Sequence, residues 1–176
     1  MKSDCKKAWE PRMTFIGATS SAYVLSIFLS LFISYSALAQ NAQTAYDTMK
    51  SLQGTWSIHS TGKGLPIVMT YNTESKESVV TEQFGKELSV FYRDGRDLLM
   101  THFCNIGNQP RLRLKSGSNP NIFKFEMFDI TNLSDPNAAH VQRIVYEFIN
   151  DRRLHLTIIW KRGPRESVED YTLDRG

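Results

Sequence analysis

The sequence predicts an all-β fold: an antiparallel up-and-down β-barrel of about eight to ten strands with a short N-terminal helix, preceded by a signal peptide. Three observations carry this prediction. Short runs of alternating apolar and polar residues recur after residue 54, turn residues separate these runs, and one helical stretch precedes them. A meander of this length tends to close, because closure removes exposed edge strands. A two-layer β-sandwich is the alternative.

The helix is expected at Thr44–Leu52, where Ala45, Met49 and Leu52 recur at helical spacing before Gly54. Asp94-Gly95 suits a tight hairpin turn, and glycine, proline and asparagine separate the other runs. Alternation between these turns predicts strands at Thr55–His59, Ile67–Asn72, Ser78–Phe84, Leu88–Arg93, Asp97–Cys104, Arg111–Ser116, Ile122–Thr131, Val141–Ile149, Leu154–Lys161 and Glu166–Leu173.

Residues 1–39 have the pattern of a signal peptide. A basic start precedes an uncharged stretch whose most apolar part is Ala22–Ile33, and Ala37-Leu38-Ala39 suits cleavage before Gln40. The alternative is an uncleaved membrane anchor, since the uncharged stretch is long enough to span a bilayer. Translation could also begin at Met13. We therefore expect an exported protein, periplasmic or secreted, with one domain over residues 40–176.

Composition limits the choice of partner for this domain. Cleavage would remove four basic and two acidic residues, which lowers the formal net charge from +3 to about +1. No basic stripe with interleaved aromatic residues suggests a nucleic-acid partner. Any membrane contact is expected only through an uncleaved N-terminal segment. The sequence names no cofactor, and the expected partner is a small molecule.

The expected barrel starts with a short helix, then Gly54-Thr55-Trp56, then a hairpin meander. This arrangement resembles the calycin superfamily, which includes lipocalins, fatty-acid-binding proteins and nitrobindins. In that superfamily a basic residue from the last strand covers the tryptophan. The matching residue here is Arg175, and the resemblance implies that Trp56 and Arg175 close the base of the barrel through a cation–π contact.

A second resemblance is more specific. Tyr92-Arg93-Asp94-Gly95, then Leu-Met-Thr-His-Phe-Cys at 99–104 and Gly-Asn-Gln-Pro-Arg at 107–111, are similar to motifs of a group of uncharacterised exported bacterial proteins with a lipocalin-like domain. That pattern has tyrosine where this chain has Phe103. The resemblance implies a lipocalin-like barrel and says nothing about activity.

The motif at 99–104 also holds the candidate site. Alternation places Met100, His102 and Cys104 on one face of a strand. These side chains suit the wall of a ligand cavity, and they are also ligand types for copper or haem iron. A Cys104–His102 pair would suit a nucleophilic enzyme. The structural alternative is a buried histidine and an inert thiol.

The turn after this strand adds polar groups. Asn108, Gln109 and Arg111 suit a rim that binds the polar end of a ligand, or else a loop that bonds its own backbone. Arg111 could instead pair with Glu82 or Glu87. We expect a barrel that binds a small, partly apolar molecule in its interior; the expected contacts are Met100, His102, Cys104, Asn108, Gln109, Arg111, Tyr92 and Trp160.

Overall fold

The computed structural model describes residues 42–59, 67–117 and 119–176. The expected signal peptide and both candidate start residues lie outside these ranges. A helix spans residues 42–51, two residues earlier at its start than expected. The strands are β1 (Gly54–His59), β2 (Ile67–Glu74), β3 (Val79–Phe84), β4 (Glu87–Asp94), β5 (Asp97–Phe103), β6 (Gln109–Lys115), β7 (Ile122–Thr131), β8 (His140–Asn150), β9 (Arg153–Arg162) and β10 (Arg165–Arg175).

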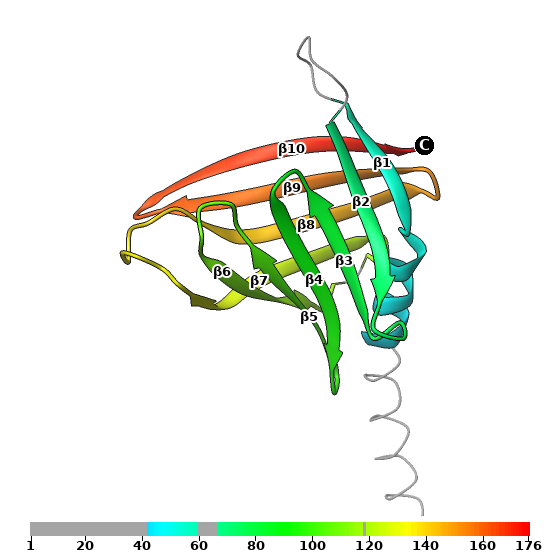
Figure 1. Cartoon of the computed structure of the whole chain (residues 1–176), viewed down its shortest axis with the longest axis horizontal. Coiled ribbons are helices and arrows are strands. Elements are labelled where there is room, and N and C mark those ends of the chain that lie inside the picture. Colours follow the sequence, from blue (N-terminus) through cyan, green and yellow to red (C-terminus); the bar gives the residue numbers. More distant parts are fainter. Residues whose placement is uncertain (1–41, 60–66, 118) are drawn as a thin grey trace, which may run out of the picture. The chain divides into compact units, whose positions relative to one another are not determined.

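The strands form one closed antiparallel barrel, so the predicted fold class is confirmed and the sandwich is not observed (Figure 1). Each strand pairs with the next strand in the chain, and β1 closes the ring by pairing with β10 from Trp56↔Arg175 to His59↔Thr172. Short turns make this order possible. Gly95 in the β4–β5 hairpin has φ 57°, the left-handed conformation that glycine adopts without a steric penalty.

The helix defines one end of the barrel, which we call the helix end. Tyr46 donates a hydrogen bond to the carbonyl of Glu77 in the β2–β3 turn, and Lys50 Nζ lies 3.0 Å from the Glu77 carboxylate. Because the strands alternate in direction, the β4–β5, β6–β7 and β8–β9 turns lie at this same end. The β3–β4, β5–β6, β7–β8 and β9–β10 connections lie at the opposite end, which we call the open end.

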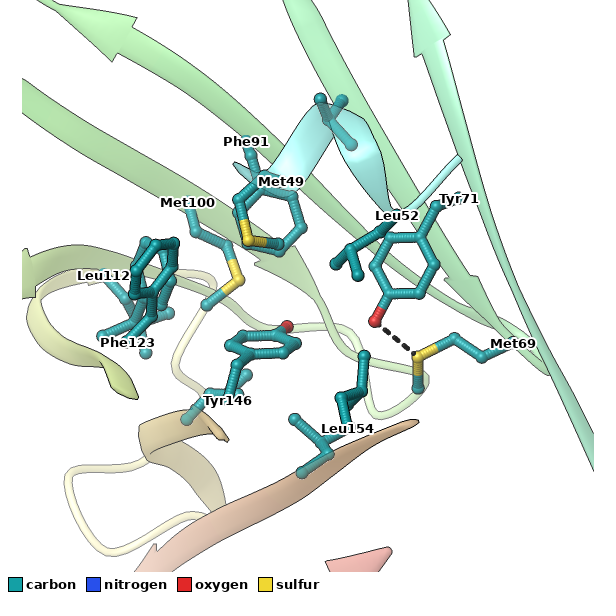
Figure 2. Close-up of a cluster of buried hydrophobic side chains, with 14 of the residues drawn as sticks. Met49, Leu52, Met69, Tyr71, Phe91, Met100, Leu112, Phe123, Tyr146 and Leu154 are labelled. Carbon is teal, nitrogen blue, oxygen red and sulfur yellow. Dashed lines mark hydrogen bonds between the residues drawn. The ribbon is translucent and has the colours of Figure 1, made fainter. Parts of the chain in front are cut away.

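The helix forms because its apolar residues lie on one face, and that face packs on the barrel. Met49 and Leu52 are nearly inaccessible to solvent and extend into the core beside Tyr71 and Phe91 (Figure 2). Burial of these side chains in the barrel removes apolar surface from water. For one large side chain, this stabilises the folded state by roughly 1.5–3 kcal/mol.

Aromatic side chains fill the middle of the barrel. Phe91, Phe125 and Tyr146 pack edge to face, with ring centroids 5.6–6.0 Å apart. Met69, Met100 and Leu112 belong to the same buried cluster (Figure 2). The middle of the interior is therefore a packed core, and a separate hollow of about 380 Å³ at the helix end is lined in part by Ala45, Leu98 and Phe123. Among the described residues, no helix is long and apolar enough to cross a membrane.

Arg175 and Trp56 meet at the base of the barrel. The guanidinium carbon of Arg175 lies 4.8 Å from the centroid of the Trp56 ring, and the same side chain donates a hydrogen bond to the carbonyl of Ser51. Trp56 is buried and donates its indole N–H to the carbonyl of Leu52 at 2.7 Å. These contacts join the last strand, the first strand and the end of the helix.

We expect Arg175→Ala to lower the free energy of unfolding by about 1–3 kcal/mol, because it removes the cation–π contact and the hydrogen bond to the helix end. Urea unfolding followed by tryptophan fluorescence measures this change. Arg165→Ala is the matched control, since Arg165 is exposed on the same strand, and it should change stability by less than about 0.5 kcal/mol. Equal losses in both variants would contradict a special role for Arg175.

Candidate functional site

The row Met100, His102 and Cys104 lies inside the barrel. Met100 is fully buried, His102 is 4% exposed and Cys104 is 7% exposed. Register pairing extends this row sideways: Ser89 on β4 is the partner of His102, and Glu82 on β3 is the partner of Ser89. Three polar side chains from three adjacent strands therefore cross the interior at one level.

Glu82 is the centre of a buried hydrogen-bond network. Tyr71 on β2 and Tyr146 on β8 each donate to Glu82 Oε2 at 2.7 Å, and Ser89 donates to Oε1 at 3.0 Å. All four residues are buried in the wall of the barrel. Tyr146 and Glu82 are 64 residues apart in the chain, so the network links its two halves. Glu82, Ser89 and the two tyrosines are not among the site residues expected from the sequence.

The missed residues had one visible signal. Val80, Glu82 and Phe84 alternate along β3, so Glu82 shares a face with two apolar side chains. An acidic residue on the apolar face of a strand points to a buried polar contact. Its partners could not be identified in advance, because they depend on the register of β3 with β4 and on the distant strand β8.

His102 continues the network toward the open end. Its Nδ1 lies 3.0 Å from Ser89 Oγ, while Nε2 is buried without a hydrogen-bond partner among the described residues. The nearest carboxylate oxygen, Oε2 of Glu87, is 3.8 Å from Nε2. Burial lowers the pKa of His102 to about 4, so the ring is neutral near pH 7.

Burial acts in the opposite direction on the acids of this region. Burial raises the pKa of Glu82, although three hydrogen bonds stabilise the carboxylate and act to lower that pKa. Burial also raises the pKa of Glu87, against a hydrogen bond from the backbone of Asn105. The pKa values of Tyr71 and Tyr146 are raised, first by burial and then by the charge of Glu82, so both phenols stay protonated and act as donors.

A very small cavity lies beside His102. Its volume is about 10 Å³, roughly the space that one water molecule needs. Glu82, Glu87, Ser89 and Phe84 help to line it. Phe84, which lines the cavity, packs edge to face against Tyr171 with centroids 5.6 Å apart, and both rings are only partly buried.

Cys104 follows β5 at the open end. Burial raises the pKa of its thiol to about 12, and the nearby Glu87 charge adds to the effect. Within the described residues, no hydrogen bond joins Cys104 to His102, whose Nδ1 instead contacts Ser89. The thiol is therefore protonated at neutral pH.

The amide groups of the polar turn after Cys104 form hydrogen bonds within the protein. The Cys104 N–H donates to the Asn108 carbonyl, and the buried Asn108 side chain donates to the carbonyl of Ala139 at 2.8 Å. Gln109 donates to the carbonyl of Gly107 and accepts from Thr131. These bonds tie the β5–β6 and β7–β8 connections together. An open hollow of about 350 Å³ lies beside Asn108 on the rim.

Three remaining expected contacts lie at different places. Arg111 is half exposed, pairs with Asp129 across β6–β7, and has its guanidinium 5.7 Å from the Phe128 ring. It does not pair with Glu82 or Glu87, because those carboxylates lie inside the barrel. Tyr92 contacts Thr101 through its hydroxyl, on the strand face opposite the interior row, so neither Arg111 nor Tyr92 lines the interior. Trp160 packs against the core, partly exposed.

Within the part of the chain that the structure describes, no group of three or more histidine, cysteine, aspartate or glutamate side chains is arranged to hold a metal ion. No protein-family model matches the chain, and no curated protein matches it in sequence.

The buried histidine predicts a specific loss of stability in acid. As pH falls from about 6.5 to about 4, the unfolded chain protonates His102 before the folded chain does, so the folded state loses about 3 kcal/mol relative to a variant without this group. The difference in unfolding free energy between the wild type and His102→Gln, measured across this range, isolates the effect. His155→Gln, at a half-exposed ring outside the barrel, should keep the wild-type slope.

Cys104 should react slowly in the folded protein. Raising the thiol pKa from 9.0 to about 12 lowers the thiolate fraction about 1000-fold near pH 8, and burial adds a steric barrier. Iodoacetamide labelling of Cys104, read by peptide mass spectrometry, should therefore be at least about 100-fold faster after denaturation. Rapid labelling of the folded chain that slows in His102→Ala would instead support a Cys–His nucleophile.

Proposed function

We propose that the protein is an exported, lipocalin-like barrel that binds a small, neutral, partly apolar molecule in the open-end half of its interior. Its family would be the calycins, as Gly54, Trp56 and Arg175 suggest, and residues 1–39 would direct its export. The observation that carries the binding proposal is His102 Nε2. A buried nitrogen without a hydrogen-bond partner costs about 1–3 kcal/mol, and a ligand that meets it offsets this cost.

The packed core limits the size of the ligand. Phe91, Phe125 and Tyr146 fill the barrel between Glu82 and the helix end, so a long acyl chain has no path toward the helix end. The free volume beside His102, about 10 Å³, is also too small for an organic molecule while Phe84 and Tyr171 stay in contact. Binding therefore requires this aromatic pair to separate, which its partial exposure favours.

The surroundings of His102 suit a molecule with one polar end. Met69, Leu156 and Ile158 supply apolar surface around the cavity, and Ser89, His102 and Glu87 supply the polar side. Trp160 belongs to the partly buried rim, and its indole N–H has no partner among the described residues. A neutral ligand is favoured over an acid, because Glu82 and Glu87 are the nearest ionisable groups and no described lysine or arginine contacts either of them.

Cyclohexanol is a suitable probe, since it is small, neutral and apolar except for one hydroxyl. We expect saturable binding in a ¹⁵N NMR titration, with shift changes at Phe84, Ser89 and His102. His102→Phe should abolish saturation. Phe84→Ala should bind the probe several-fold more tightly, because it removes one ring of the Phe84–Tyr171 pair.

Arg111→Ala is the matched control, because it alters the outer surface and should leave the cyclohexanol titration unchanged. Shift changes confined to the outer face, or no saturation in either the wild type or Phe84→Ala, would contradict the proposal. Native mass spectrometry of protein purified from its own host adds a direct search for a retained molecule.

A further inference from the structure

With Glu82 as a carboxylate, which only accepts, the buried network has one hydrogen-bond direction, because each hydroxyl holds one proton. The Tyr71 hydroxyl also lies 3.0 Å from the sulfur of Met69, which is a weaker acceptor than the carboxylate at 2.7 Å (Figure 2). Tyr71 and Tyr146 both donate to Oε2 of Glu82, and Ser89 donates to Oε1. Glu82 thus accepts three hydrogen bonds on two oxygens. A carboxylate, which has acceptor sites only, satisfies all three donors, and the 2.7 Å tyrosine contacts have the length of charge-assisted bonds.

This direction fixes the tautomer of His102. Ser89 gives its single proton to Glu82, so its oxygen can only accept from His102 Nδ1 at 3.0 Å. The proton of the neutral imidazole therefore sits on Nδ1, and Nε2 presents a lone pair. The 3.8 Å separation from Glu87 is too long for a hydrogen bond, which leaves this lone pair available at the cavity.

We propose that Glu82, acting through Ser89, determines the ligand class of the site: a molecule that offers an O–H or N–H donor to His102 Nε2. This inference rests on the proposed binding function. Glu82 does not touch the ligand in this proposal. It is a positioning residue, because it determines whether Nε2 of His102, which does touch the ligand, donates or accepts a hydrogen bond. A ligand that can only accept a hydrogen bond, such as a ketone or an ether, would meet a second acceptor at Nε2 and would bind less well.

The groups that face Glu82 and His102 come from every side of the network. They are Tyr71 from β2, Ser89 and Glu87 from β4, Cys104 after β5 and Tyr146 from β8. None of them carries a positive charge that would hold Glu82 ionised by pairing. The three hydroxyl donors alone stabilise the carboxylate, so loss of the charge at residue 82 should reverse the network and not merely weaken it.

Glu82→Gln tests this reversal. With the glutamine oxygen bonded to the two tyrosines, its NH₂ group would replace Oε1 and donate to Ser89 Oγ. Ser89 would then donate its own proton to His102 Nδ1, which moves the imidazole proton to Nε2. The variant should therefore present a donor at the cavity where the wild type presents an acceptor, with almost no change in shape.

The first measurement is the His102 tautomer in the free protein, read from two-bond ¹H–¹⁵N correlations of histidine-labelled samples near pH 7. We expect the proton on Nδ1 in the wild type and on Nε2 in Glu82→Gln. Glu126→Gln, on the outer face, is the acid-to-amide control and should keep the wild-type tautomer. In Ser89→Ala, adding Glu82→Gln should no longer change the tautomer. A proton on Nε2 in the wild type would overturn the proposal without any variant.

The second measurement compares cyclohexanol, which can donate, with the nearly isosteric cyclohexanone, which cannot. The wild type should prefer the alcohol by about tenfold, the ratio that one hydrogen bond supplies, and Glu82→Gln should lose or reverse this preference. Unchanged preference in Glu82→Gln would overturn the ligand class. If the tautomers are as expected but neither cyclohexanol nor cyclohexanone binds, the proposed binding function is rejected, and the ligand class with it. The effect of Glu82 on the His102 tautomer would still stand.

Discussion

Closure of the first strand on the last is the constraint on which the rest of this structure depends. The β1–β10 pairing turns a ten-strand meander into a ring with no unpaired strand at its seam, and the ring gives every strand an inner face. Only a closed wall brings β8 opposite β3, and so brings Tyr146 to Glu82. The contact of Arg175 with Trp56 lies at this seam. The closed base and the interior network therefore both depend on the β1–β10 pairing.

Most of the fold was predictable from sequence because its causes are local. Alternation and turn residues placed all the strands to within a few residues, and the helix was visible from the spacing of Ala45, Met49 and Leu52. The inward direction of Met100, His102 and Cys104 followed from the same period of two. Antiparallel neighbours joined by short turns leave few topologies to choose from, so local pattern was sufficient.

The polar network was not predictable in the same way. Glu82 resembles many strand glutamates until register places Ser89 and His102 beside it, and its tyrosine partners come from β2 and β8. Arg111 shows the opposite case: its residue type suggested a ligand contact, but its position in the pleat sends it outward to Asp129. The volume left inside the barrel was equally hidden, since it depends on how aromatic rings from several strands pack together.

The order of the strands also determines when the chain can fold. Trp56 on β1 pairs with Arg175 on β10, 119 residues later in the chain, so the seam can form only after β10 has been delivered. Until then, the edges of β1 and of the growing sheet expose unpaired backbone groups. Contacts this distant in sequence are typical of slow-folding proteins. If the chain is exported as proposed, its barrel could close only after β10 has been delivered, because β10 forms the seam with β1.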